Sequence, residues 1–236
     1  MSALAPAGRA DRAASDPALP TTAQHALDYL RAEIVSGALT PGARIGQELV
    51  AERLGISVAP VREALRILER EGQVTYRPRR GYIVTELRIG DLEEIYALRA
   101  LLEREAALAA IDRPGGYAEA ELGEIQRAAA RCAEAVTAGD VVAELGANRR
   151  FHSAILSPAG RPHLQRLIDL LWDSTEAYRA LYYNSAAERR ESLRAHDRIL
   201  RAIVSGDGER LVAELDAHRE RALVVLRGII GTPAAA

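Results

Sequence analysis

The chain has 236 residues, a formal net charge of −2 and a hydrophobic content of 48%. This length exceeds the usual size of one domain, so we expect a small unit and a larger one. No apolar run approaches the roughly 18 residues that a membrane span needs, and no signal-peptide pattern opens the chain, so a cytoplasmic protein without membrane contact is predicted. Cys132 is the only cysteine, which excludes an internal disulfide and fits a reducing compartment.

The arginines are unevenly placed along the chain. Residues 1–20 are rich in Ala and Pro without periodicity and are predicted to be a disordered leader. Residues 21–86 hold nine arginines against eight acidic residues, whereas residues 87–236 hold 20 against 23. Overall charge therefore does not indicate nucleic-acid binding, and the position of each arginine has to be considered instead.

Residues 21–86 have the pattern of a winged helix-turn-helix, with helices expected over 22–36, 47–54 and 58–71. Gly55 lacks a Cβ and so permits the left-handed turn that lets the second and third helices cross sharply. Ser57 is a plausible N-cap for the third helix, and Pro60 is tolerated in its first turn. On this helix Val61, Leu65 and Leu68 follow helical spacing.

The opposite face of that helix is cationic, because Arg62, Arg66 and Arg70 repeat every four residues. Two short β-prone segments follow, over 73–77 and 82–86, joined by a hairpin tip that contains Arg79, Arg80 and Gly81. An arginine face alone is more often a solvated surface. Here it occurs with the tight turn and a cationic hairpin in the right order, which favours binding of double-stranded DNA.

The segments LRAEIVSGALTPGARI, LVAERLGIS, PVREALRILEREG and RRGYIV resemble the GntR family of regulators over residues 26–86. The resemblance implies that the start of the third helix enters the major groove and that the wing approaches the minor groove. The predicted DNA-binding residues are Ser57, Val58, Ala59, Pro60, Arg62, Arg66, Arg79, Arg80 and Gly81. Two positions depart from the family pattern: Val58 replaces a usual arginine, and Glu48 stands where a basic residue is common. Val58 can contact a thymine methyl but cannot donate to guanine, so an altered operator is expected.

After a connector at 87–90, residues 91–231 are predicted to form an all-α antiparallel bundle, followed by a tail at 232–236. Six helices are expected, over 91–111, 118–138, 141–156, 162–183, 187–205 and 208–230. Glycine, proline and asparagine mark the breaks between them. The predicted fold class is thus mainly α, with a winged helix-turn-helix followed by a helical bundle.

Three bundle helices carry a histidine within the stripe that should be apolar. These are His152, which lies four residues after Asn148 on one face, together with His196 and His218. A single histidine in such a stripe is usually a hydrogen-bonded core residue. Three of them, with no obvious internal partners, favour a divalent metal site.

This second region resembles the FCD ligand-binding domain of the FadR-type branch of the same family. The matching residues are Arg99-Ala-Leu-Leu-Glu103, Asn148-x-x-Phe-His152, His196-x-x-Ile-Leu-x-Ala-Ile and His218. The resemblance implies that Asn148, His152, His196 and His218 bind a divalent metal, which could be Zn, Ni, Mn or Fe, and that a small carboxylate completes the coordination. Because Asn148 is neutral, the metal would keep its full charge, which weakens metal affinity but favours an anionic ligand.

Arg99, Tyr178 and Arg179 are the predicted effector-binding residues. Arg99 could clamp a carboxylate, or it could pair with Glu103 at i,i+4. Tyr182 and Tyr183 could also line the pocket, although ordinary packing is an alternative for these tyrosines. Phe151 and Trp172 are assigned to the core.

The sequence therefore predicts a ligand-responsive transcriptional regulator and not an enzyme. We expect a homodimer that binds a pseudo-palindromic operator. Repression is the more common mode in the family that the chain resembles, so a repressor is expected. A small carboxylate metabolite would be sensed at the buried metal. Two alternatives remain open. One is a metal-dependent hydrolase, for which Glu103 could be proposed as base. The other is a DNA-binding protein whose metal is purely structural.

Overall fold

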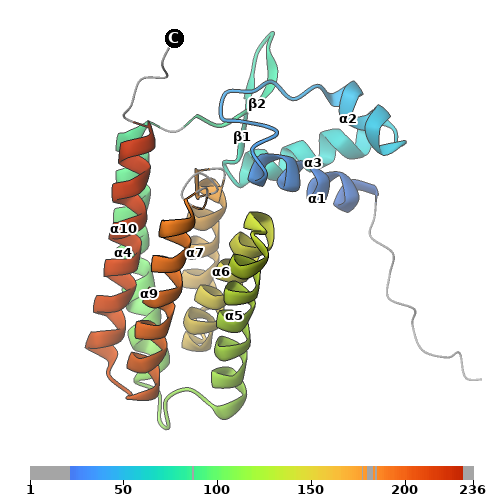
Figure 1. Cartoon of the computed structure of the whole chain (residues 1–236). Helices are drawn as coiled ribbons and strands as arrows, with labels where there is room; N and C mark the ends of the chain where they lie inside the picture. Colours follow the sequence, from blue (N-terminus) through green and yellow to red (C-terminus); the bar gives the residue numbers. More distant parts are fainter. Residues whose placement is uncertain (1–21, 87, 177, 180–182, 184, 231–236) are drawn as a thin grey trace, which may run out of the picture.

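The structure is a computed structural model that describes residues 22–230 except 87, 177, 180–182 and 184. A small unit, from α1 to β2, sits across one end of a bundle of long helices, α4 to α10 (Figure 1). This arrangement confirms the predicted fold class. The predicted leader and tail, together with Leu87, Tyr182 and Asn184, lie outside the described residues.

The small unit contains three helices: α1 (Thr22–Val35), α2 (Gln47–Leu54) and α3 (Val58–Arg70). Helix α1 packs across α3, where Leu30 and Ile34 lie in one apolar cluster with Leu65 and Leu68. Gly55 has φ 65° and ψ 32°, the left-handed conformation expected at the helix-helix corner.

The wing is an antiparallel hairpin of β1 (Val74–Arg77) and β2 (Gly81–Val84), in which Arg77 pairs with Gly81. Its tip turns at Arg79, the only described residue other than glycine with a positive φ, 67°. Pro78 before it and the Arg80 amide donating to the Arg77 carbonyl at 3.0 Å are features of a type II turn. The Arg79 side chain is therefore held at the tip by a backbone conformation that costs about 1 kcal/mol or more in a residue with a Cβ.

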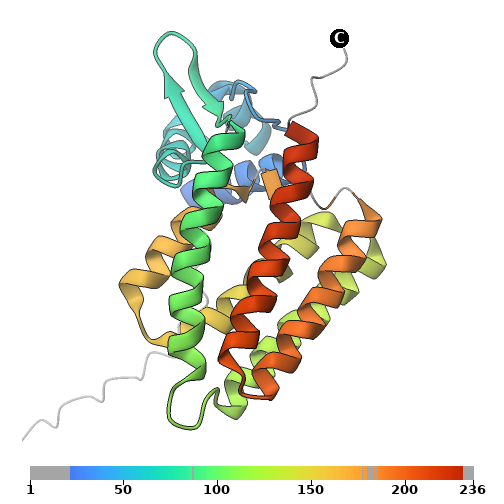
Figure 2. The same ribbon diagram turned by 90° about the vertical axis from the view of Figure 1, so that its left-hand side faces the viewer.

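The bundle contains these elements, whose bounds lie wholly within the described residues: six helices and one short 3₁₀ turn. Their bounds are α4 (Ile89–Ile111), α5 (Glu119–Ala138), α6 (Val141–Leu156), η1 (Ser157–Ala159), α7 (Pro162–Ser174), α9 (Ala186–Val204) and α10 (Gly208–Ile230). Helix α10 lies beside both α4 and α9, and α5 packs along α6 (Figure 2). Phe151, Ile155 and Ile199 are fully buried in the main cluster. Among the described residues, no helix combines the length and apolarity of a membrane span.

One predicted helix is shorter than expected. The fourth bundle helix was predicted to run over 162–183, but α7 ends at Ser174 and Thr175 is its C-cap. The Thr175 hydroxyl bonds back to the carbonyls of Leu171 and Trp172, at 3.3 and 3.2 Å. Such side-chain bonds compete with the helical ladder, and they explain a break that no glycine or proline marks.

Candidate metal centre and nucleic-acid interface

The three histidines of the sequence pattern meet inside the bundle. His152 comes from α6, His196 from α9 and His218 from α10, and one ligand nitrogen from each lies within 4.8 Å of the others. Two nitrogens bound to one zinc ion at about 2.1 Å can be at most about 4.2 Å apart. The rings therefore need only a small closing movement to share an ion.

The donor atoms of this cluster fit a metal because most of them lack another partner. Both ring nitrogens of His152 and Nδ1 of His196 are buried without a hydrogen-bond partner among the described residues. His196 Nε2 lies 3.0 Å from Oδ1 of Asn148, so the predicted fourth ligand lies beside the histidines. A buried polar atom without a partner costs about 1–3 kcal/mol, and coordination would remove that cost.

The imidazoles are neutral in this environment. Burial lowers the pKa of His152 and His196 well below 6.5, and neighbouring positive charges lower it further. Burial and the nearby Arg179 lower the pKa of His218 to about 3. Neutral imidazole is the form that binds divalent metals, so protons do not compete for this site near neutral pH.

A small cavity of about 30 Å³ adjoins the histidines. It is lined by residues from four helices and the segment after α7, namely Tyr96, Arg99, Glu103, Asn148, His152, Trp172, Arg179, Tyr183, Leu215, His218, Arg219 and Ala222. This space holds about two water molecules. An organic ligand can enter only if some of these side chains move.

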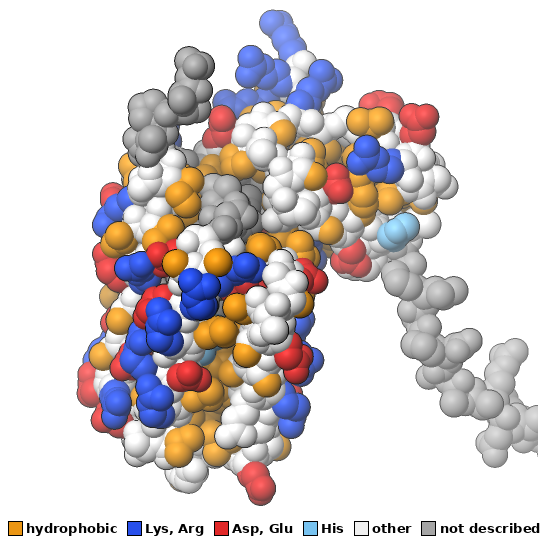
Figure 3. All heavy atoms as spheres, viewed as in Figure 1, with side chains coloured by type: hydrophobic (Ala, Val, Ile, Leu, Met, Phe, Trp, Pro, Cys, Tyr) orange, Lys and Arg blue, Asp and Glu red, His pale blue; other side chains and the backbone are white. Residues whose placement is uncertain are grey.

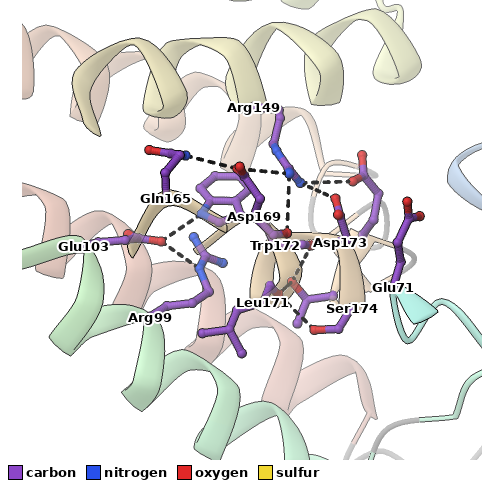
Figure 4. A network of polar contacts seen from close by, with 12 residues as sticks. Glu71, Arg99, Glu103, Arg149, Gln165, Asp169, Leu171, Trp172, Asp173 and Ser174 are labelled. Atoms are coloured by element: carbon purple, nitrogen blue, oxygen red, sulfur yellow. Dashed lines mark hydrogen bonds and ion pairs between the residues drawn. The ribbon is translucent and has the colours of Figure 1, made fainter. Parts of the chain in front are cut away.

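Glu103 organises one wall of the cavity. It accepts hydrogen bonds from Arg99 Nε and Trp172 Nε1, each at 2.8 Å (Figure 4). It also accepts one from Arg219, at 2.8 Å. Burial alone would raise the pKa of Glu103, but the two arginines outweigh burial and hold it at about 2. Arg99 therefore makes the i,i+4 pair with Glu103, and it also lines the cavity.

Arg179 differs from the other two arginines of the cavity. Its side chain is 5% exposed, and neither terminal nitrogen has a hydrogen-bond partner among the described residues. Its guanidinium and that of Arg99 each lie 4.0 Å from the Trp172 ring centre, which is a cation–π arrangement. With one buried carboxylate for three arginines and a neutral Asn148, the cavity carries excess positive charge and favours an anionic ligand.

The structure separates the predicted effector residues into two groups. Arg99, Arg179 and Tyr183 line the cavity, whereas Tyr178 donates a hydrogen bond to the carbonyl of Thr85 beside the wing. The sequence interpretation missed Tyr96 and Arg219, which follows His218 directly. It assigned Trp172 only to the core, but this residue both packs in the core and lines the cavity.

The predicted DNA-binding residues lie on one unit. Arg62, Arg66 and Ser57 are exposed at or near the start of α3, where Val58 and Pro60 are half-buried and Ala59 is exposed. Ser57 is the N-cap, but its side chain makes no capping bond, contrary to the prediction. Being exposed, its hydroxyl can be satisfied by solvent. Arg62 Nε donates to Gln47 of α2 at 3.2 Å, which orients the guanidinium.

Arginine side chains gather over the hairpin at the top of the molecule in Figure 3. Arg77, Arg79 and Arg80 are all exposed there, and Gly81 is half-buried. Glu69 of α3 fixes the base of the wing, since it accepts hydrogen bonds from the Tyr76 amide at 3.3 Å and the Tyr82 hydroxyl at 3.4 Å. Glu69 thus connects the wing to α3, the helix that carries the arginine face.

The fold and this surface define a winged helix-turn-helix protein joined to an all-helical domain. Residues 22–84 match the model of the bacterial regulatory proteins of the gntR family, and residues 94–221 match that of the FCD domain. The chain therefore belongs to the GntR family and carries an FCD domain, which makes it a transcriptional regulator and not an enzyme.

Relatives agree with this assignment. The chain is 30% identical over 192 residues to the HTH-type transcriptional regulator YdhC of Bacillus subtilis, covering 81% of this chain and 84% of that protein. It is 31% identical over 182 residues to the HTH-type transcriptional regulator McbR of Escherichia coli, covering 76% and 81%. The solved structure of E. coli McbR/YncC aligns with a TM-score of 0.77 at 27% identity, covering 89% of this chain and 99% of that one.

Proposed function

We propose that the protein is a ligand-responsive transcriptional repressor that binds a pseudo-palindromic DNA operator as a homodimer. Its effector is a small carboxylate metabolite bound at a divalent metal in the FCD domain, within residues 91–231. The observation that carries this proposal is the set of orphaned ring nitrogens on His152 and His196, beside the orphaned guanidinium of Arg179. A cation would take one ring nitrogen from each histidine, and an anion would take the terminal nitrogens of Arg179.

In this proposal His152, His196 and His218 hold the metal, with Asn148 as the fourth ligand. Zn, Ni, Mn and Fe all accept this donor set. When bound, the metal would supply a positively charged open position for a carboxylate oxygen. Arg179 pairs with the anion and Arg99 reinforces its field, while Glu103 keeps Arg99 and Arg219 in place.

At the other end of the molecule, residues 21–86 engage the operator. Arg62 and Arg66 point from α3 toward the major groove, with Ser57, Val58, Ala59 and Pro60 at its leading end. Arg79, Arg80 and Gly81 bring the wing to the minor groove or to phosphates. Glu48 and Val58 remove two donors that are usual in the family, so the operator differs from the family's common sequence.

The test of the metal centre is the metal content of purified protein, measured by elemental analysis after dialysis against zinc. Wild type should retain about one ion per chain, whereas His196→Ala/His218→Ala should retain almost none, because two of four ligands are lost. His163→Ala is the matched control, since His163 is exposed on α7. Equal metal content in the double variant would contradict the ligand assignment.

The regulatory role is tested by operator binding, with duplexes selected from a random-sequence pool. Zinc together with malonate, used as a carboxylate probe, should weaken wild-type binding, and the double histidine variant should not respond. A metal that is retained but leaves operator affinity unchanged, with or without malonate, would instead indicate a purely structural site. The unpartnered Arg179 beside the histidines argues against that alternative.

A further inference from the structure

The end of α7 faces the cavity on one side. The guanidiniums of Arg99 and Arg179 each lie 4.0 Å from the Trp172 ring centre. Trp172 also donates to Glu103 (Figure 4). The Arg179 amide in turn donates to the Thr175 carbonyl at 3.0 Å. Arg179 is therefore hydrogen-bonded directly to Thr175, the C-cap residue at which α7 ends.

The same short segment contacts the DNA-binding unit on its other side. Gly72 follows the C-cap of α3, and a Cβ on Gly72 would lie 3.3 Å from the Ser174 Cβ. Tyr178 donates to the Thr85 carbonyl, and its ring packs in a cluster with Val35 of α1. In Figure 4, Ser174 and Glu71 lie on the side of Trp172 opposite Glu103.

The charged side chains described at the contact between the end of α7 and the end of α3 do not pair with one another. Asp173 lies near Glu71, a residue of like charge, and each carboxylate is held by its own arginine. Arg149 donates to Asp173 at 2.8 Å, while Arg31 of α1 donates to Glu71 at 2.6 Å. Among the described residues, no ion pair crosses from α7 to the end of α3, so packing and the Tyr178 hydrogen bond make this contact.

The cavity is too small for a metabolite, so a bound ligand has to displace part of its wall. Most of the wall is stiff: Arg99 and Arg219 are held by Glu103, and the histidines come from continuous helices. Arg179 and Trp172 border a break in the wall, at Thr175. Displacement is expected there because the terminal nitrogens of Arg179 have no hydrogen bond to lose and gain one with the anion.

We propose that residues 172–176 with Tyr178 and Arg179, named here the coupling segment, transmit occupancy of the histidine cavity to the C-terminal end of α3. This inference rests on the proposed function, and it names the element that carries the signal. When the cavity fills, Trp172 and Arg179 shift, and Ser174 and Tyr178 shift with them. Gly72 and Thr85 then move, which tilts α3 from the end opposite its DNA-reading residues.

The test uses thermodynamic reciprocity. If malonate bound to the zinc form changes operator affinity by some factor, the operator changes malonate affinity by the same factor. Malonate affinity of the zinc-loaded full chain is measured by titration, with and without a duplex selected from random sequences. Trp172 is the only tryptophan, so its fluorescence reports filling of the cavity in the same samples. The affinity ratio is the malonate affinity without the duplex divided by that with it, and for wild type we expect a value on the order of 5 to 100.

Two variants disturb the segment without touching the cavity lining. Tyr178→Phe removes only the hydroxyl that reaches Thr85, and Ser174→Leu places a wedge against Gly72. The matched control is Ser205→Leu, at the α9–α10 turn at the far end of the bundle (Figure 1). Ser205 is a close match because its hydroxyl donates to the carbonyl three residues earlier at 3.0 Å, as that of Ser174 does at 2.9 Å.

Ser174→Leu should bring the affinity ratio close to 1, and Tyr178→Phe should reduce it severalfold. Both should keep the wild-type affinity of the zinc form for malonate in the absence of DNA, and Ser205→Leu should keep the full ratio. A wild-type ratio of 1 with zinc and malonate bound, or full ratios in both segment variants, would overturn the coupling segment. Loss of zinc or malonate binding in the segment variants would also overturn it, because these residues would then belong to the site. Failure of wild type to bind zinc, or of its zinc form to bind malonate, contradicts the proposed function itself.

Discussion

Arg179 combines a buried charge with the lack of any hydrogen-bond partner for its terminal nitrogens. Such a group destabilises the ligand-free fold and binds an anion without first breaking another interaction. Arg179→Met should therefore raise the free energy of unfolding of the empty protein by about 1–3 kcal/mol. It should also weaken malonate binding to the zinc form by roughly 10- to 100-fold, the loss of one charged hydrogen bond or more.

Thermal unfolding and Trp172 fluorescence measure these two effects separately. Arg166→Met is the control, because Arg166 is exposed on α7 and its loss should change neither quantity. Unchanged malonate affinity in Arg179→Met would remove this residue from the effector site. Zinc affinity should be kept in either case, since Arg179 offers no metal ligand.

Glu103 has the opposite character, because it is the one carboxylate that neutralises two buried arginines. Its folded pKa of about 2 lies below the ordinary 4.5, so its contribution to stability is complete above pH 4.5 and is lost as the pH falls toward 2. Glu103→Gln leaves the buried Arg99 without a counter-charge and leaves Arg219 with only the half-exposed Asp216, so it should cost about 3–5 kcal/mol at neutral pH.

Urea unfolding across a pH series measures this cost. The difference between wild type and Glu103→Gln should be constant above pH 5 and shrink steadily below pH 4.5. Glu209→Gln serves as the reference, since the Glu209 side chain is 75% exposed and pairs only at the surface. A difference that stays constant down to pH 2.5 would show that Glu103 is not held ionised by its arginines.

At the scale of the elements, α3 presents two arginines in different surroundings. Arg62 lies near the leading end and is oriented by Gln47, whereas Arg70 lies at the last turn and donates to the Arg66 carbonyl. Arg62→Ala should weaken operator binding by roughly 1–3 kcal/mol if it contacts a base, and it should relax the preference at that base. Arg70→Ala should have a much smaller effect. Fluorescence anisotropy with single-base operator variants distinguishes the two, and equal effects would argue against base contact by Arg62.

Local sequence signals account for most helix boundaries and for one break that was missed. Gly55, Gly139 and Gly206 all have positive φ, and each ends a helix close to the residue predicted. Thr175 gives no such signal, because a threonine is compatible with a helix unless its hydroxyl bonds to the preceding turn. The predicted helix over 162–183 therefore ran through the point where the cavity wall can move.

The candidate site was predictable only in part, for a related reason. The histidines stood out because polar residues interrupted apolar stripes within single helices. The roles of Trp172 and Arg219 depend on Glu103, which is 69 and 116 residues away in sequence. Periodicity within one helix cannot show which distant carboxylate neutralises an arginine, or that Arg179 has none.

On the scale of the whole molecule, charge is divided between the two parts. Exposed arginines gather on α3 and the wing, while residues 87–236 carry more acidic groups than arginines. Binding to DNA should thus depend on a few phosphate contacts, which a homodimer makes twice. Each contact contributes about 0.9 to the slope of log affinity against log salt concentration.

The wing provides a measure of how many protomers bind. If Arg79 and Arg80 each contact a phosphate, Arg79→Ala/Arg80→Ala should lower that slope by about 1.8 for one bound protomer and about 3.6 for a dimer. Arg190→Ala/Arg201→Ala is the matched control, because both arginines are exposed on α9, away from the DNA-binding surface. The slope is measured by operator titrations between low and moderate salt. We expect the double variant to lower it by about 3.6, the value for a dimer. A loss near 1.8 would contradict binding as a dimer, and an unchanged slope would show that the wing tip does not contact the phosphates.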